Sequence, residues 1–273
     1  MKYTNLFPAS EVKKLEKLSN AEEKSRAGLV KFGSNVPLSI DVLERLDPLN
    51  YLLKMNGKQA FTESERELEP GMRYWGEVTH KRGEKLVVKS LIKQPDFFGE
   101  IKQHSLLNPK RAIEAFKNNV SDEFQRNFKK EIMTQMASTD TKEEFLFLNQ
   151  LLLSMENNVI SIPINYGDKS AMFQYQYGKD KKRKRVEEKK VLDDLDFYAA
   201  FDLLGPMRGK IIYFNDETHL NLEVNFDTTR EFLIQHSGEQ EIFSNLKIAI
   251  KVIKDEIQPL YSFTQNNLLD LRT

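Results

Sequence analysis

The stretch that decides the fold is His219-Leu-Asn-Leu-Glu-Val-Asn-Phe226. Apolar and polar residues alternate through it without a break. The apolar set is Leu220, Leu222, Val224 and Phe226. This alternation predicts a β-strand with one buried face, because successive side chains of a strand point to opposite sides. The other face would then present Asn221, Glu223 and Asn225 to solvent.

The residues around this strand predict a covered hairpin. Lys210–Phe214 reads as an apolar strand, and the polar link 215–218 would join the two strands as a tight hairpin. Asp227 can cap a first helix, which would end at Gly238. A second helix is expected over Glu241–Ile257, from an apolar stripe at spacings of four, four, three and four. The stripe is Ile242, Leu246, Ile250, Ile253 and Ile257.

The composition excludes several classes of function. The chain has 273 residues, and its 41 Lys and Arg balance its 41 Asp and Glu, so no global field attracts nucleic acid or an anionic membrane. The absence of cysteine rules out disulfides, thiolate nucleophiles and cysteine metal sites. No apolar run approaches the roughly 20 residues of a membrane span, and the first residues lack the apolar core of a secretory signal. We therefore expect a cytoplasmic protein.

The pattern along the chain predicts an α+β protein. Residues 1–36 suggest a helix and a linker, and 37–95 a small antiparallel β domain resembling a barrel. Its clearest signals are Asn56-Gly57, typical of a two-residue hairpin turn, and the Pro70-Gly71 turn. Residues 96–157 are expected to be helical, and 158–273 to form a C-terminal sheet covered by helices.

The helical middle contains three expected helices, at 111–116, 121–136 and 141–156. In the last, Asp140 or Thr141 can act as the N-cap and Asn157-Asn158 would end the helix. Its expected apolar stripe is Phe145, Leu148, Leu152 and Met155. Two extended segments follow, over Val159–Ile164 and Ala171–Tyr177, and Pro163 favours an edge position for the first.

No pattern indicates catalysis. The histidines share no metal-ligand spacing, and no carboxylate pair stands out as an acid/base couple. The histidines are His80, His104, His219 and His236. The segment Gly205–Gly209 lacks the Lys-Ser/Thr of a phosphate loop. We expect no enzyme activity, no metal and no cofactor.

Two features keep nucleic-acid binding open as an alternative function. The run Lys179–Lys190 holds eight basic residues against three acidic ones. It could contact phosphates, or it could be a solvated loop between strands. Tyr74 and Trp75 in the small β domain could stack on single-stranded bases, or they could pack in the domain.

The C-terminal part resembles the C-terminal domain of the flagellar hook-length control family. The resemblance covers residues 158–264 and depends on the order of elements. The matching segments are Ile162-Pro-Ile164, the strand Met172–Tyr177, the Leu-Gly step in Phe201–Met207, the hairpin Lys210–Phe226 and a helix pair whose second member is Glu241–Glu256. Two departures are visible: Pro206 follows Gly205 where the family usually places proline before the Leu-Gly step, and no Pro-, Gln- or Ser-rich ruler segment is present.

This resemblance implies a role in flagellar assembly through protein–protein contact. The domain would contact the cytoplasmic part of a flagellar type III export-gate protein and switch its substrate specificity, with hook or hook-cap proteins as further partners. Export of the chain through the flagellar apparatus is a second implied location. The expected contact residues are Leu204, Gly205, Pro206, Arg208, Asn221, Glu223 and Asn225.

Overall fold

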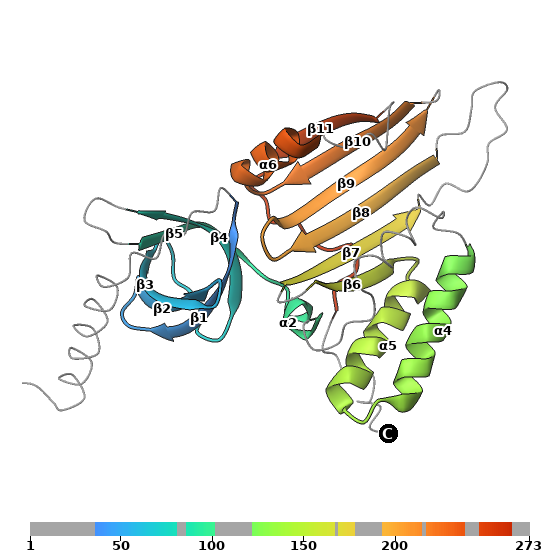
Figure 1. Cartoon of the computed structure of the whole chain (residues 1–273), viewed down its shortest axis with the longest axis horizontal. Helices are drawn as coiled ribbons and strands as arrows, with labels where there is room; N and C mark the ends of the chain where they lie inside the picture. The colour runs from blue at the N-terminus through green and yellow to red at the C-terminus, as the bar shows by residue number, and fades with distance from the viewer. Residues whose placement is uncertain are drawn as a thin grey trace, which may run out of the picture. The chain divides into compact units, whose positions relative to one another are not determined.

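The structure of the protein is a computed structural model that describes residues 36–80, 86–101, 122–166, 169–177, 193–214, 217–237 and 246–263. The chain forms two compact units, residues 1–93 and 94–273 (Figure 1). The first is a β-barrel, and the second combines helices with a six-stranded sheet. The predicted α+β class is confirmed. The helix expected within residues 1–36 and the one expected at 111–116 lie outside the described residues.

The first unit is a closed barrel with the strand order β1-β2-β3-β5-β4. Its strands are β1 (Leu38–Arg45), β2 (Asn50–Met55), β3 (Lys58–Ser64), β4 (Arg73–His80) and β5 (Leu86–Lys93). β1 pairs with β4 and closes the barrel. The pairing of β3 with β5 is parallel, so the barrel is not purely antiparallel as the sequence suggested.

Alternating apolar residues fill the barrel. In β1, for example, Leu38, Ile40 and Val42 are buried while the residues between them are partly exposed. The turn from β2 to β3 is made by Asn56 and Gly57, whose φ angles of 48° and 75° are both in the left-handed region. Two such residues in a row define the hairpin turn that matches the twist of paired strands. The predicted hairpin is confirmed.

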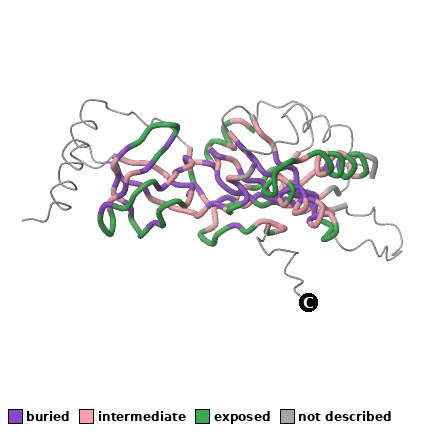
Figure 2. Tube along the Cα trace, turned by 90° about the horizontal axis from the view of Figure 1, so that it is seen from below, coloured by how far each residue is buried: buried purple, intermediate pink, exposed green. Residues whose placement is uncertain are grey.

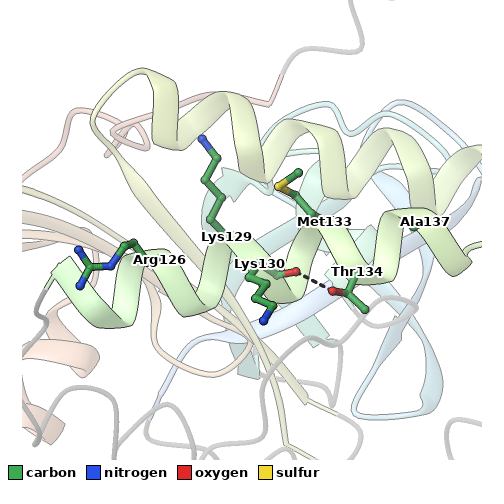
Figure 3. A pocket seen from close by; sticks show the side chains of 6 residues that line it. All are labelled: Arg126, Lys129, Lys130, Met133, Thr134 and Ala137. Atoms are coloured by element: carbon green, nitrogen blue, oxygen red, sulfur yellow. Dashed lines mark hydrogen bonds between the residues drawn. The ribbon is translucent and has the colours of Figure 1, made fainter.

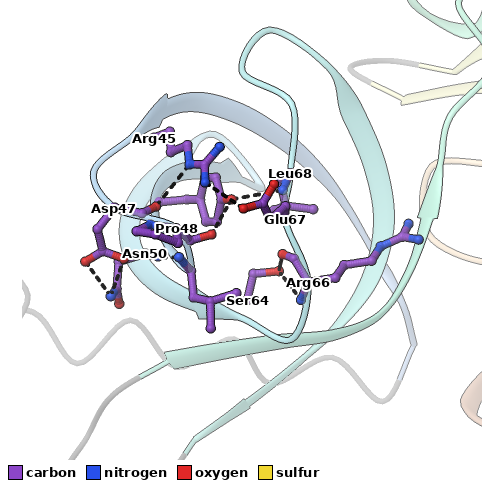
Figure 4. Close-up of polar contacts among 10 residues, drawn as sticks. Arg45, Asp47, Pro48, Asn50, Ser64, Arg66, Glu67 and Leu68 are labelled. Atoms are coloured by element: carbon purple, nitrogen blue, oxygen red, sulfur yellow. Dashed lines mark hydrogen bonds and ion pairs between the residues drawn. The ribbon is translucent and has the colours of Figure 1, made fainter.

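The ring of Tyr51 is buried, and its hydroxyl joins two segments of the barrel unit. Figure 4 shows the polar contacts around Pro48 and Leu68 in these segments. The Tyr51 hydroxyl donates to the carbonyl of Pro48 at 2.9 Å and accepts from the amide of Leu68 at 3.0 Å. Arg45 pairs with Glu67 at 2.8 Å beside it. These bonds connect the β1–β2 turn to the loop 65–72 that follows β3. They fix this loop in place, although it contains no helix or strand.

The second unit is built on a sheet with the strand order β11-β10-β9-β8-β7-β6. Its strands are β6 (Ile160–Tyr166), β7 (Lys169–Tyr177), β8 (Asp193–Phe201), β9 (Gly205–Phe214), β10 (Glu217–Val224) and β11 (Leu246–Val252). Its helices are α2 (Phe97–Ile101), α4 (Asp122–Ser138), α5 (Lys142–Glu156) and α6 (Asp227–Ser237). β6 to β10 are antiparallel neighbours in chain order. The predicted hairpin of β9 and β10 and the edge position of the Pro163 strand are confirmed.

Helix α5 begins and ends as its sequence predicts. The Thr141 side chain accepts from the amide of Glu144 at 3.3 Å, and Asn157 is the C-cap. Its expected apolar stripe is partly wrong. Leu148 is buried together with Phe147 and Leu151, whereas Phe145 is 43% exposed. An i, i+3, i+4 pattern beginning at Phe147 fits this apolar sequence as well as one beginning at Phe145, and tertiary packing selects between them.

The expected second helix over Glu241–Ile257 is wrong where the chain is described. Residues Leu246–Val252 form β11, which pairs in parallel with β10. The spacing of four that suggested a helix is also a multiple of two, and so it fits a strand equally well. In β11 the β-branched Ile248, Ile250 and Val252 alternate with more polar residues, which favours the strand.

After β11, residues 253–263, which we call the crossing segment, run across one face of the sheet. The Ile253 amide donates to the carbonyl of Val224 at the end of β10. Farther on, the amide of Tyr261 donates to Gln174 Oε1 on β7, and Gln174 Nε2 donates to the carbonyl of Tyr261 at 2.8 Å. Phe263 then packs against Phe97 of α2 at a ring distance of 4.9 Å. The segment thus ties the β10 side of the sheet to the helical side.

The face under the crossing segment is buried over β6, β7 and the second half of β8, and it opens from the start of β8 toward β11. Gln174 and Tyr198, which stand opposite each other on β7 and β8, are both 0% exposed. On the same face, Asn221, Lys247 and Lys251 are exposed. In Figure 2 the buried stretches, in purple, form the interior of each unit. This face of the sheet therefore has one buried half and one half that is exposed to solvent.

Candidate contact surface

The open half of this sheet face carries three of the residues that the sequence singled out. Glu223 on β10 stands between Arg208 on β9 and Lys251 on β11 in the strand registers. Asn221 stands between Lys210 and Ala249. Arg208, Asn221 and Lys251 are exposed and Glu223 is half-buried. Because directly opposite residues of paired strands share one side of the sheet, these side chains form a continuous surface.

Acidic and basic groups are interleaved over the whole of this surface. The basic residues are Arg208, Lys210, Lys247 and Lys251, and the acidic ones are Asp194, Asp196, Glu217 and Glu223. We call these eight residues, together with His219 and Asn221 on the same side of the sheet, the mixed-charge face. Four charges of each sign leave no net field to attract a polyanion. Such a surface is suited to a partner whose charges are also mixed, which is typical of a protein.

Ion pairs fix one corner of the mixed-charge face. Lys247 Nζ lies 2.7 Å from Glu217 Oε2, and His219 Nε2 lies 3.3 Å from the same oxygen. The hydrogen bond from Lys247 is the main reason that the pKa of Glu217 is lowered. Across the sheet, Lys210 Nζ lies 2.5 Å from Asp194, and that hydrogen bond raises the pKa of Lys210. Glu217 and Lys210 therefore carry their charges at neutral pH.

The turn before β9 has a packing role. Gly205 and Pro206 are buried, and Leu204 is half-buried with its carbonyl accepting from the Thr229 hydroxyl at 2.8 Å. Gly205 has a φ of 72°, and a Cβ there would lie 2.6 Å from the Phe226 ring. The turn positions α6 against the sheet, and among Leu204 to Arg208 only Arg208 is exposed.

The side chain of Asn225 is hydrogen-bonded to the crossing segment. Its Nδ2 donates to the carbonyls of Ile253 at 3.1 Å and Asp255 at 2.7 Å. Its Oδ1 accepts from the amide of Ile257 at 3.4 Å. The alternation of the sequence placed Asn225 on the same face as Asn221 and Glu223. Its hydrogen-bond partners lie some 30 residues farther along the chain, so the alternation could not predict them.

Two residues of the mixed-charge face were assigned to the wrong kind of element from the sequence. Lys247 and Lys251 were assigned to a helix, yet they alternate with Ile248 and Ile250 at the period of a strand. That period was the signal that could have placed them beside Asn221 and Glu223.

Of the residues that suggested nucleic-acid binding, Tyr74 and Trp75 lie on β4 of the barrel unit. Tyr74 and Trp75 are 4% and 1% exposed, so neither ring has a free face for a base, and the packing interpretation holds. The basic run Lys179–Lys190 lies outside the described residues.

A second surface lies along α4 (Figure 3). An open hollow there is lined by Arg126, Lys129, Lys130, Met133, Thr134 and Ala137. Lys129 Nζ pairs with Glu156 of α5 at 2.9 Å, and this bond lowers the pKa of Glu156. The hollow contains no acidic side chain and no histidine among these lining residues, so it has no acid/base pair.

Other kinds of site are not found in the described parts of the chain. Their His, Asp and Glu residues form no cluster of three that could hold a metal ion. Within the same ranges, no helix combines the length and the apolar character needed to cross a bilayer. Comparisons with protein-family models, curated proteins and solved structures give no match.

Proposed function

We propose that this protein acts in flagellar assembly, where residues 158–273 contact the cytoplasmic part of a type III export-gate protein and change which substrates it accepts. The observation that carries the contact role is the mixed-charge face, a solvent-facing surface with four charges of each sign over β8 to β11. The flagellar context comes from the family resemblance.

The order of elements supports the resemblance up to α6. The described structure has an edge strand with Pro163, a second strand, a turn at Leu204-Gly205, the β9–β10 hairpin and a helix, in the order on which the resemblance depends. It departs from the expected pattern at 246–252, which is a strand.

The proposed mechanism is recognition without covalent chemistry. A gate with two states shifts toward the state that binds the mixed-charge face more tightly, and the shift is limited by the difference between the two affinities. Arg208, Asn221 and Glu223 would make the contact. Gly205, Pro206 and Asn225 would support it by positioning α6 and the crossing segment.

The test uses surface variants that leave the fold intact. In a flagellated host, Arg208→Glu and Glu223→Lys should give hooks of abnormal length or missing filaments. Lys130→Glu on α4 and Glu65→Lys in the barrel unit make the same charge changes at other exposed positions. They should leave hooks normal. Unchanged hooks, filaments and swimming after deletion of the gene would contradict the flagellar role.

A further inference from the structure

The outer edge of the sheet at β11 has no strand beside it in the described chain, since β10 is its single neighbour there. The strand has seven residues, of which four are exposed and none is buried. An edge strand presents backbone N–H and C=O groups that can pair with another extended chain.

β11 lacks several features that prevent unwanted pairing of edge strands. It contains no proline, and its register with β10 runs without a bulge from Leu246 to Val252. β6, at the other edge, has Pro163 and packs against α5. Proline, bulges, covering helices and charged side chains are the usual protections of an edge. β11 contacts α6 and carries two lysines, whose charge disfavours pairing with another basic strand.

The two faces of β11 differ in chemistry. Lys247 and Lys251 lie on the mixed-charge face, and Ile248, Ile250 and Val252 lie on the opposite one. Ile248 is 39% exposed, and the neighbouring helix α6 has two further exposed apolar side chains, Phe232 at 36% and Ile234 at 57%. These are three of the seven large apolar residues exposed in the described chain.

We propose that an extended segment of a protein partner pairs with β11 as an added strand. In this segment acidic and aliphatic side chains alternate. Cross-strand neighbours on one face would then be carboxylates opposite Lys247 and Lys251. Those on the other face would be aliphatic groups against Ile248 and Ile250. Opposite charges and aliphatic pairs at such positions each stabilise a strand pair, whereas like charges destabilise it.

A second copy of the chain is a poorer occupant. With two β11 strands fully overlapped and antiparallel, Lys247 of one copy stands opposite Lys251 of the other on the same face. The pairing would place two like-charge contacts in one short ladder. A basic strand meets the same obstacle, so the edge selects for acidic side chains.

This inference deepens the proposed contact function, because it names the kind of segment that the sheet recognises. Its test contains no flagellar component. Failure to bind the probe would therefore leave the flagellar proposal standing, and normal hooks in a deletion strain would not affect the result at β11.

The probe is a labelled synthetic peptide with glutamate and valine alternating over seven residues, titrated with the full chain at low salt. A second peptide carries lysine in place of glutamate. We expect the glutamate peptide to bind about tenfold tighter than the lysine peptide. Binding should slow hydrogen exchange at the amides of 247–251.

The matched variants are Lys247→Glu with Lys251→Glu, and Lys130→Glu with Lys254→Glu, which make the same charge change at exposed positions outside β11. The first pair should reverse the peptide preference and the second should keep it. Because Lys247 is paired with Glu217, the single variant Lys251→Gln serves as a milder test and should weaken the glutamate peptide alone. Absence of binding at about 1 mM peptide, equal effects of both double variants, or binding without protection of β11 would each overturn the proposal.

Discussion

At one edge of the six-stranded sheet, β6 carries Pro163 and packs against α5, and Ile162 on this strand is 0% exposed. At the other edge, β11 has neither a proline nor a buried residue, and Ile248 is 39% exposed. Both isoleucines lie on the same face of the sheet through the strand registers. The comparison separates the part of the sheet that stabilises the unit from the part that is free to bind.

Truncating the two isoleucines should show the largest difference between the edges. Ile162→Ala removes a fully buried side chain and should lower the free energy of unfolding by about 2–5 kcal/mol through lost burial and a cavity. Ile248→Ala removes a partly exposed one and should cost less than about 1 kcal/mol. Urea unfolding of the full chain measures both. Equal costs would mean that β11 is as enclosed as β6.

The two side-chain amides that bond to the crossing segment should also contribute unequally to stability, with the larger contribution from the buried half of the sheet. Gln174→Ala leaves the backbone groups of Tyr261 unbonded in a buried place and should cost about 2–3 kcal/mol. Asn225→Ala removes bonds at the half that faces solvent and should cost about 1 kcal/mol. Urea unfolding gives the values. Gln174→Met, which keeps the length of the side chain but removes the amide, is the control for size. A larger loss at Asn225 than at Gln174 would contradict the division of the sheet.

Reversing a charge on the open half should have a small effect on stability. Glu223→Lys should lower the free energy of unfolding by no more than about 1 kcal/mol, because the new positive charge stands opposite Arg208 and Lys251 but like-charge repulsion is weak at a surface that faces solvent. Leu222→Ala, one residue away on the buried face, is the contrast and should cost about 2–5 kcal/mol. Thermal unfolding of the two variants distinguishes scaffold from surface. A severe loss in Glu223→Lys would show that this residue belongs to the packing.

The smallest effect expected is a pH dependence at the corner of the mixed-charge face. The pKa of Glu217 is lowered mainly by its hydrogen bond from Lys247, so the pair stabilises the folded state above the ordinary glutamate pKa of 4.5. This contribution is lost as the pH falls through the lowered pKa, where the carboxylate takes up a proton. An NMR titration should give a Glu217 pKa below 4.5 that rises toward that value in Lys247→Met. An unchanged pKa in the variant would show that Lys247 is not the cause.

The strands could be predicted from the sequence where apolar and polar residues alternate over a few positions, or where a turn has a characteristic residue pair. The alternation of 219–226 gave β10 and its buried face, and Asn56-Gly57 gave the hairpin of the barrel, because both signals act over a few residues. β11 was missed since apolar residues four apart satisfy the helix and the strand alike. The parallel pairing of β10 with β11 depends on the crossover between them, which no local pattern encodes.

The candidate surface was partly predictable for the same reason. Arg208, Asn221 and Glu223 follow from the strands that carry them. The burial of Gly205 against Phe226 and the use of Asn225 by the crossing segment depend on contacts made after the sheet is assembled. Lys247 and Lys251 join the surface only because β11 is a strand.

Hydrogen exchange of the free full-length chain tests the difference between the two edges most directly. Amides that open only with the whole unit exchange slowest, and those in exposed edge strands open locally. We predict that the slowest amides of β6 exchange at least about a hundredfold more slowly than the slowest amides of β11. Equal protection of the two strands would contradict an open edge at β11.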